Sequence, residues 1–288
     1  MKTDGLYIAS DKHSRLNDLW LRYKRNKPGV MGLIILVSLI IIALLAPVFS
    51  TYSIDLSRRS LPPCTNFIMG TDHLGRDILS GIILGARTSL EIGLVVALLS
   101  TGIGTVAGVL AGYYGRWVDG LISKVIEILL CIPSFFLIVV IIAFIGSSLM
   151  YEIIVLASLL WPSTARLARA SVLTIKELSY VEAAKVGGAG DKRIIFRHVL
   201  PNAITPILIN MSFLAASAIL TEAGLSFLGL GDPNLVSWGM MLNYAIPYIR
   251  TQYWQVFFPG LAIFMTILAF NLFGDALNDA LNPRLKER

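Results

Sequence analysis

Long blocks of apolar residues constrain this chain more than any other feature. Val30 to Phe49 runs for 20 residues without a charged side chain, and five later blocks have similar lengths. A helix needs about 20 mainly apolar residues to cross the hydrocarbon of a bilayer. The blocks therefore predict an all-α membrane protein with six transmembrane helices, at about 30–49, 89–111, 121–146, 152–168, 204–225 and 254–274.

The composition agrees with this class of protein. Charged residues make up 15% of the chain, whereas a soluble domain carries about 25%. The net charge of +6 is expected of a membrane protein, because Lys and Arg accumulate on cytoplasmic loops. We therefore expect contact with a lipid bilayer and none with nucleic acid, since the sequence has no basic stripe interleaved with aromatic residues. The two cysteines, Cys64 and Cys131, are not expected to form a disulfide.

The distribution of Lys and Arg predicts the orientation. With six crossings, the segments on one side carry 19 of these residues and those on the other side carry 5. The richer side belongs in the cytoplasm. Seven of the basic residues precede Val30, unlike the short basic head of a cleavable signal. Both termini and the basic loop at about 170–203 are therefore expected to be cytoplasmic.

These assignments divide the chain into five parts. Irregular polar backbone cannot face lipid, so the polar stretch after the first crossing must lie outside the membrane or line a cavity. The parts are a cytoplasmic basic leader at 1–29, a first transmembrane anchor at 30–49, an extracytoplasmic segment at 50–86, a five-helix core at 87–276 and a cytoplasmic tail at 277–288.

Three glycines recur at four-residue spacing in the second apolar block: Gly104, Gly108 and Gly112. Residues four apart lie on one face of a helix, and glycine there lets another helix approach closely. We expect a tight helix–helix contact at this face. The alternative is a hinge for a conformational change.

Five acidic residues lie in or beside the apolar blocks: Glu91, Glu127, Glu152, Glu222 and Asp275. A charge in the hydrocarbon costs about 2.5–3.5 kcal/mol on insertion scales, so such a residue is a candidate for function. Glu127 and Glu222 lie deeper than the others. They are expected either to hydrogen-bond a neighbouring helix or to face a translocation path. No His or Lys accompanies them, so a proton relay is not expected.

The basic loop carries signals for two short helices. Ser179 and Glu182 have capping-box spacing, which predicts a helix that starts beside Ser179 as its cap. The glycines within 187–190 are expected to end it, because glycine tolerates the left-handed conformation at a helix C-terminus. Asp191 is expected to cap the second helix, and Pro201 to allow a turn into the next crossing. A knob of this kind can dock into a groove on a soluble partner.

The same loop resembles the EAA loop of ABC-importer permeases. That pattern, E-A-A-x3-G-x9-I-x-L-P, is matched by Glu182, Ala183, Ala184, Gly188, Leu200 and Pro201. His198 stands where the pattern has isoleucine, but the stretch 197–202 resembles the dipeptide, oligopeptide and nickel branch of the family. Residues 70–77 and 225–231, the latter followed by Ser-Trp-Gly at 237–239, resemble the same branch.

The resemblance implies a type I ABC-importer transmembrane fold and the C-type subunit of a permease pair. The helix that contains Glu182 would be a coupling helix seated in a cleft of a cytoplasmic ATPase. The implied partners are a second homologous permease, one or two ABC ATPase subunits and an extracytoplasmic solute-binding protein. ATP and magnesium would be bound by those partners, so no cofactor is expected in this chain. The implied location is the inner (cytoplasmic) membrane of a prokaryote, as a multi-pass protein.

The substrate and the driving force have alternatives. Di- and oligopeptides are preferred over nickel, since nothing in the apolar blocks resembles a metal cage. His73 and two aspartates within 70–77 are a weak metal signal, and a structured outer loop is the preferred interpretation. The alternative of another class is a secondary transporter driven by an ion gradient. It would favour broken helices, ionisable groups at the midplane and an internal repeat, which the sequence does not show clearly. No catalytic residue is expected, because the sequence lacks a G-x-x-x-x-G-K-[ST] phosphate loop and an H-E-x-x-H motif.

Overall fold

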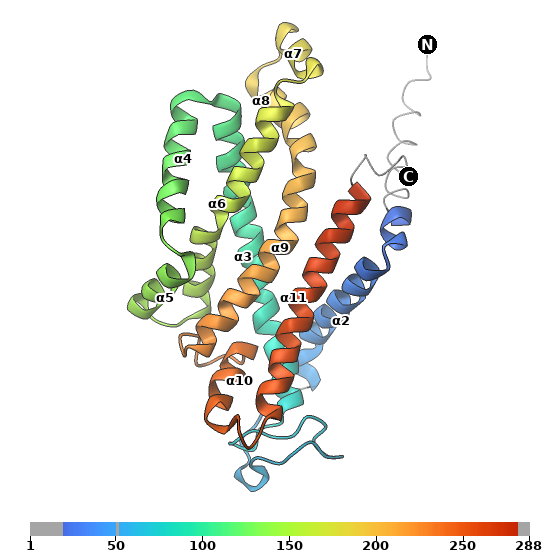
Figure 1. Cartoon of the computed structure of the whole chain (residues 1–288), viewed down its shortest axis with the longest axis vertical. Helices are drawn as coiled ribbons and strands as arrows, with labels where there is room; N and C mark the ends of the chain where they lie inside the picture. The colour runs from blue at the N-terminus through green and yellow to red at the C-terminus, as the bar shows by residue number, and fades with distance from the viewer. Residues whose placement is uncertain (1–19, 50–51, 282–288) are drawn as a thin grey trace.

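The structure is a bundle of long helices with a structured loop region at each end (Figure 1). It is a computed structural model that describes residues 20–49 and 52–281, so most of the basic leader and the end of the tail lie outside it. The helices are α2 (Lys27–Phe49), α3 (Ile78–Tyr114), α4 (Arg116–Cys131), α5 (Ser134–Ile145), α6 (Leu149–Ile175), α7 (Ser179–Val186), α8 (Asp191–Ile194), α9 (Leu200–Phe227), α10 (Trp238–Ala245) and α11 (Trp254–Leu281). The expected all-α membrane fold is confirmed.

Among the described residues, five helical segments are long and apolar enough to cross a membrane alone, and α4 with α5 can supply a sixth crossing. The prediction of one continuous helix at 121–146 is wrong, because α4 and α5 are bent by 82°. Pro133 explains the break. It lacks the N–H that a helix interior needs, and it disfavours the helical conformation of the residue before it. Ile132 accordingly has extended backbone angles.

Most crossings are longer than their apolar blocks. α3 begins at Ile78, so the segment expected outside at 50–86 already contains the start of this helix. The carboxylate of Asp77 accepts the backbone N–H of Ser80 at 2.9 Å and caps it. Pro162 lies inside α6 without ending it. Hydropathy identifies only the part of a helix that is suited to lipid, whereas caps and tertiary contacts extend helices beyond it.

α3 packs most extensively against α6, and the three spaced glycines lie at this contact. A Cβ atom on Gly104 would stand 2.7 Å from the carbonyl oxygen of Trp161, and one on Gly112 would stand 2.9 Å from that of Arg169. At Gly108 the added atom would overlap the carbonyl oxygen of Ala165. This is the close helix approach that the spacing predicts, rather than an unpacked hinge.

The end of the bundle at the bottom of Figure 1 is built from the 52–77 loop, α10 and the start of α11. Trp238 is fully buried, and its Nε1 donates to the carbonyl oxygen of Ile82 on α3 at 3.0 Å. Trp254 at the start of α11 donates to the carbonyl oxygen of Thr71 at 3.2 Å. These indole anchors hold the outer loop and α10 against the crossing helices.

Candidate functional site

The loop between α6 and α9 projects from one end of the bundle, at the top of Figure 1. The start of α2 and the end of α11 lie at this end, whereas α10 and the 52–77 loop lie at the other. This arrangement agrees with the predicted topology, in which the basic loop shares a side with the beginning of the first crossing and the end of the last one.

α7 is held by one apolar side chain and exposes most of the others. Val181 is fully buried in a cluster with Val172 of α6 and Ile194 of α8. Glu182 and Ala183 are exposed, and Val186 is 90% exposed. The EAA segment therefore presents an acidic and apolar surface away from the bundle. Ala184 is half-buried beneath it.

The predicted caps of the two loop helices are wrong. Ser179 is the first residue of α7, and the cap position is Leu178, which has no side chain that could accept a hydrogen bond. Glu182 is therefore not part of a capping box. Gly190, not Asp191, holds the cap position of α8. The Asp191 carboxylate instead accepts a hydrogen bond from the hydroxyl of Tyr113 on α3. Spacing alone does not decide whether a serine takes helical or extended backbone angles at a helix start.

The end of α7 follows the prediction for glycine. Gly188 has a φ of +79°, in the left-handed region. The N–H of Ala189 donates to the carbonyl oxygen of Ala184 at 3.0 Å, and that of Gly188 donates to Lys185, also at 3.0 Å. These two bonds form a Schellman motif with Gly188 in its left-handed position. The glycine of the EAA pattern therefore has a defined conformational role.

No turn separates the loop from the fifth crossing. α8 continues through a π-helical turn, Ile195–Val199, directly into α9, so the expected turn at Pro201 is wrong. Pro201 has no N–H, and its ring would clash with the carbonyl of residue 197 in a regular α-helix. In the wider turn the N–H of Leu200 instead bonds to the carbonyl oxygen of Ile195, five residues back. Leu200 packs against the cluster that anchors α7.

His198, the departure from the EAA pattern, joins α7 to this π-helical turn. Its ring centroid lies 6.2 Å from that of Tyr180 on α7. Asn202 donates to the hydroxyl of Tyr180 at 3.1 Å and to the carbonyl oxygen of His198 at 2.6 Å. The contact between His198 and Tyr180 joins two aromatic rings, which an isoleucine at position 198 would not do.

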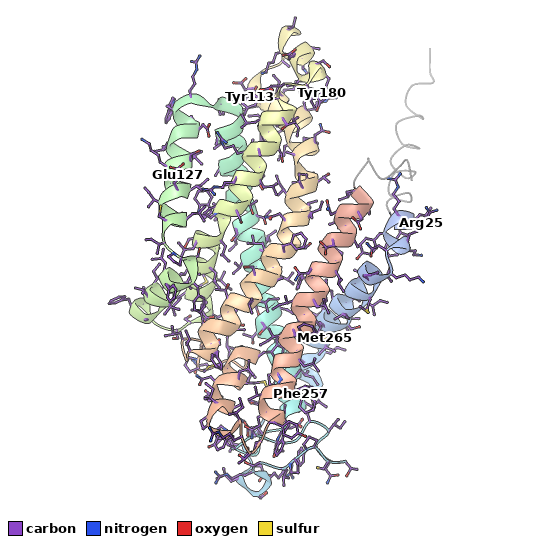
Figure 2. The ribbon with its side chains drawn as sticks, viewed as in Figure 1. Arg25, Tyr113, Glu127, Tyr180, Phe257 and Met265 are labelled. Atoms are coloured by element: carbon purple, nitrogen blue, oxygen red, sulfur yellow. The ribbon has the colours of Figure 1, made fainter. Side chains whose placement is uncertain are left out.

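Tyr113, near the end of α3, ties the loop to the bundle. Its hydroxyl donates to the Asp191 carboxylate at 2.8 Å, and the ammonium group of Lys185 lies 5.8 Å from the centre of its ring. Figure 2 shows Tyr113 and Tyr180 close to the α7 end of the molecule. Lys176, after α6, donates to the carbonyl oxygen of Gly112 at 2.9 Å. Sequence reasoning missed these residues, because their partners lie far away along the chain.

A second missed contact lies beside the loop. Arg169 of α6 makes a bidentate ion pair with Asp119 of α4, with Nε–Oδ1 and Nη2–Oδ2 distances of 2.5 and 2.6 Å. The arginine fork matches both carboxylate oxygens, which fixes the relative orientation of the two helices. The ends of α3, α4, α6 and α8 beside the loop are therefore joined by polar contacts.

The two deep glutamates differ in environment. Glu222 is 1% exposed and accepts hydrogen bonds from Ser226 at 2.7 Å and from Ser89 of α3 at 3.3 Å. Glu222 is therefore an interhelical hydrogen-bond partner, the first of the two roles expected for it. Glu127 is exposed on α4 (Figure 2). Glu152, expected near a helix end, is 1% exposed in the first turn of α6.

The outer stretch at 70–77 forms a turn and a helix cap. The Asp72 carboxylate accepts the backbone N–H groups of Leu74 and Arg76 and pairs with the Arg76 guanidinium at 2.6 Å. The His73 ring stacks on Tyr248, 5.0 Å between centroids. Within the described residues no group of three His, Cys, Asp or Glu side chains could hold a metal ion. The preferred interpretation, a structured outer loop, therefore describes this segment.

Comparison with known proteins decides the family. Residues 104–287 match the model of the binding-protein-dependent transport system inner membrane component, and residues 14–63 match that of the N-terminal transmembrane domain of oligopeptide transport permease C. The chain belongs to this permease family. It is a membrane-embedded permease subunit of a bacterial transporter and works with other permease and ATPase subunits.

Relatives of this permease resemble it over nearly its whole length. A dipeptide transport system permease protein of Alkalihalophilus pseudofirmus is 41% identical, with 91% of this chain and 88% of the relative covered. A glutathione transport system permease protein of Pectobacterium atrosepticum is 38% identical, with 98% and 96% covered. An oligopeptide transport system permease protein of Bacillus subtilis is 37% identical, with 99% and 94% covered.

The permease also resembles a solved structure. A chain of the MetNI methionine ABC transporter, in an inward-facing conformation, matches 71% of this chain and 98% of its own length, with a TM-score of 0.59 and 20% identity. At this identity the likeness shows the fold alone. It confirms the type I ABC-importer transmembrane fold that the EAA resemblance implies.

Proposed function

We propose that this permease forms the translocation path for di- or oligopeptides, together with a second homologous permease. One or two ABC ATPase subunits would drive it from the cytoplasm, and an extracytoplasmic solute-binding protein would deliver the substrate. The observation that carries the substrate class is the set of relatives, whose names refer to a dipeptide, an oligopeptide and glutathione, itself a small peptide. Nickel is the alternative within the same branch.

We propose that α7 is the coupling helix. Its exposed surface around Glu182 and Val186 combines a charge with an apolar contact, which suits a groove on a soluble partner. ATP bound by the ATPase subunits would close them and displace α7. The helix would then move its buried anchor, Val181, with the α6 and α8 side chains packed around it.

The polar contacts of the loop would pass this movement to other helices. The hydrogen bond from Tyr113 to Asp191 reaches α3, and the α8 segment is continuous with α9. Packed side chains and hydrogen bonds of this kind transmit a displacement when they have two discrete arrangements. The proposal therefore requires α3, α6 and α9 to move together with α7.

The coupling role is tested by reversing the charge on α7. Glu182→Lys is expected to lower peptide uptake in proteoliposomes that contain the complete transporter, while ATP hydrolysis continues. Glu177→Lys makes the same change on an exposed residue just before α7 and is the matched control. Unchanged uptake in Glu182→Lys with normal membrane insertion would contradict the coupling assignment.

The substrate is tested by competition. Uptake of a labelled dipeptide by the complete transporter is expected to fall when unlabelled di- or oligopeptides are added and to stay constant with nickel ions. The same competition on the isolated solute-binding protein shows whether selection occurs before the permease. Binding of nickel without binding of peptides would overturn the substrate proposal and leave the coupling proposal intact.

A further inference from the structure

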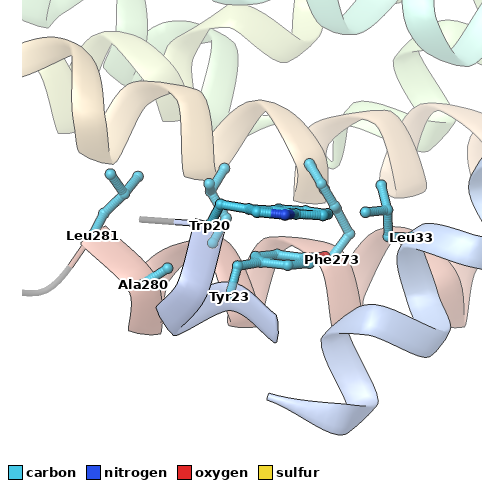
Figure 3. A pocket seen from close by; sticks show the side chains of 7 residues that line it. Trp20, Tyr23, Leu33, Phe273, Ala280 and Leu281 are labelled. Carbon is cyan, nitrogen blue, oxygen red and sulfur yellow. The ribbon is translucent and has the colours of Figure 1, made fainter. Parts of the chain in front are cut away.

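An apolar groove lies between the N-terminal segment and the end of α11 (Figure 3). Residues 20–25 form a helical turn before α2. Tyr23 of this turn packs on Ala276 and Ala280 of α11, and the groove lies along this contact. Its volume is about 410 Å³, and every lining side chain is aliphatic or aromatic: Trp20, Tyr23, Leu33, Phe273, Leu277, Ala280 and Leu281. This volume lies within the range of roughly 300–1,000 Å³ typical of ligand sites.

The groove is a fixed feature of the fold. Tyr23 is buried, and its hydroxyl donates to the carbonyl oxygen of Gly29 at 2.8 Å, which holds the turn against the start of α2. Its ring packs against Phe273 of α11, with 6.0 Å between centroids. Trp20 stacks on Tyr23 yet stays 47% exposed. The groove is therefore open on the side of Trp20.

The position of the groove is that of the inner membrane boundary. α2 and α11 are both long and apolar enough to cross the membrane, and the groove lies where α2 begins and α11 ends. Trp and Tyr side chains favour this boundary, because their rings are apolar and their polar edges reach water. The apolar lining then faces the part of the hydrocarbon layer next to the head groups of the inner leaflet.

Basic residues lie in the same segment, and one of them reaches a side chain that lines the groove. Arg22, Lys24, Arg25 and Lys27 belong to the same segment, and the ammonium group of Lys24 lies 5.0 Å from the centre of the Trp20 ring. The acidic side chain in contact with this segment, Asp279, accepts a hydrogen bond from Asn26 at 3.0 Å. The described part of the segment thus combines an apolar groove, a net positive charge and one ammonium group beside the exposed Trp20 ring.

We propose that this groove binds an anionic phospholipid of the inner leaflet. One acyl chain would lie among Trp20, Leu277 and Leu281, and the phosphate would contact Lys24 and its basic neighbours. The lining offers no polar side chain apart from the edges of Trp20 and Tyr23, so a peptide backbone would lose its hydrogen bonds there. Basic pockets between transmembrane helices on the cytoplasmic side suit anionic head groups.

The proposal is tested by native mass spectrometry of the complete transporter, purified in detergent with equal amounts of phosphatidylglycerol and phosphatidylcholine. Phosphatidylglycerol is expected to be retained preferentially. Lys24→Gln is expected to weaken this retention roughly fivefold, since a basic residue near an anionic surface contributes about that factor. Lys124→Gln removes the same charge from an exposed position on α4 and is expected to leave retention unchanged.

A second pair of variants tests the acyl-chain site. Leu277→Trp fills the groove and is expected to abolish the preferential retention. Leu44→Trp places the same side chain on an exposed position of α2 away from the groove and is the matched control. Equal retention of the two phospholipids by the unchanged protein would overturn the proposal. So would retention that neither Lys24→Gln nor Leu277→Trp reduces.

Discussion

The hydroxyl of Tyr113 donates a 2.8 Å hydrogen bond to the carboxylate of Asp191, and this bond joins the inner end of α3 to the loop that bears the EAA pattern. The two residues are 78 positions apart in the sequence. α3 is also the helix that packs most extensively on α6, from which the loop departs. A displacement of the loop therefore acts on α3 through a polar contact and on α6 through the chain itself.

Removing this hydrogen bond is expected to weaken coupling. Tyr113→Phe deletes only the hydroxyl, and the loss of about 0.5–1.5 kcal/mol corresponds to uptake per ATP that is up to about tenfold lower. The ratio of peptide uptake to ATP hydrolysis in proteoliposomes measures it. Tyr114→Phe makes the same change on the adjacent residue and is the control. A normal ratio in both Tyr113→Phe and Asp191→Ala would exclude this contact from the coupling route.

Gly188→Ala is expected to distort the end of α7. An alanine in the left-handed conformation costs about 1–2 kcal/mol, and no atom lies within 4 Å of the added Cβ, so the effect is conformational. Gly190→Ala adds the same atom in equally open space at a φ of −68° and is expected to have little effect. ATP-driven uptake by the two variants, at equal amounts in the membrane, is the measurement. Equal uptake would show that the left-handed residue is dispensable.

Gly108→Ala is expected to destabilise the α3–α6 contact. The new methyl group would overlap the carbonyl oxygen of Ala165, and overpacking of this kind costs about 1–3 kcal/mol. Gly102→Ala on the same helix meets no atom within 4 Å and is expected to preserve or raise stability, because alanine favours helix more than glycine does. Thermal unfolding midpoints in one detergent compare them. A midpoint that falls equally in both variants would argue against a close contact at Gly108.

The outer loop is expected to lose stability in acid. Burial lowers the pKa of His73 below its ordinary value of about 6.5, and the nearby guanidinium groups of Arg76 and Arg59 lower it further, against the opposing effect of Asp72. The folded loop thus favours the neutral His73 ring, which stacks on Tyr248. The neutral ring contributes its full stabilisation when the pH is above the pKa of His73 in the unfolded chain. This stabilisation is lost as the pH falls from the unfolded pKa towards and through the lower folded pKa, because the unfolded chain binds the proton more readily.

Limited proteolysis of the outer loop between pH 7.5 and pH 5 measures this effect. His73→Phe keeps the ring and is expected to flatten the pH dependence, whereas His198→Phe, in the loop at the other end, is expected to leave it in place. Identical pH profiles for the unchanged protein and His73→Phe would assign the effect to other groups.

The orientation in the membrane is checked by cysteine labelling of intact cells. Cys64 lies exposed in the outer loop and is expected to react with a reagent that does not cross the membrane. A cysteine introduced by Lys185→Cys on α7, in a protein whose Cys64 is replaced by serine, is expected to react only after the cells are opened. Cys131 is exchanged for serine in all samples, since it is also exposed. Labelling at position 185 from outside would reverse the topology.

Several features of the fold and site could be predicted because their causes are local. The apolar block from Val30 to Phe49 became α2 almost unchanged, and Gly188 ended α7 through bonds within six residues. The spacing of Gly104 to Gly112 indicated a helix contact without naming α6 as the partner. The cap at Ser179 failed because the backbone angles of one residue depend on how the whole loop packs on Val181.

By itself, the sequence located the apolar blocks that can cross a membrane and the loop that carries the EAA pattern, and its basic residues predicted the side on which that loop lies. These properties depend on the cost of placing charge in lipid and on residues that are neighbours in the chain. The tertiary structure decided that α4 and α5 diverge by 82° and that Glu222 bonds to Ser89. It also decided that Tyr113 reaches Asp191. Such contacts join distant parts of the chain, and only the packing of whole helices brings them within hydrogen-bond distance.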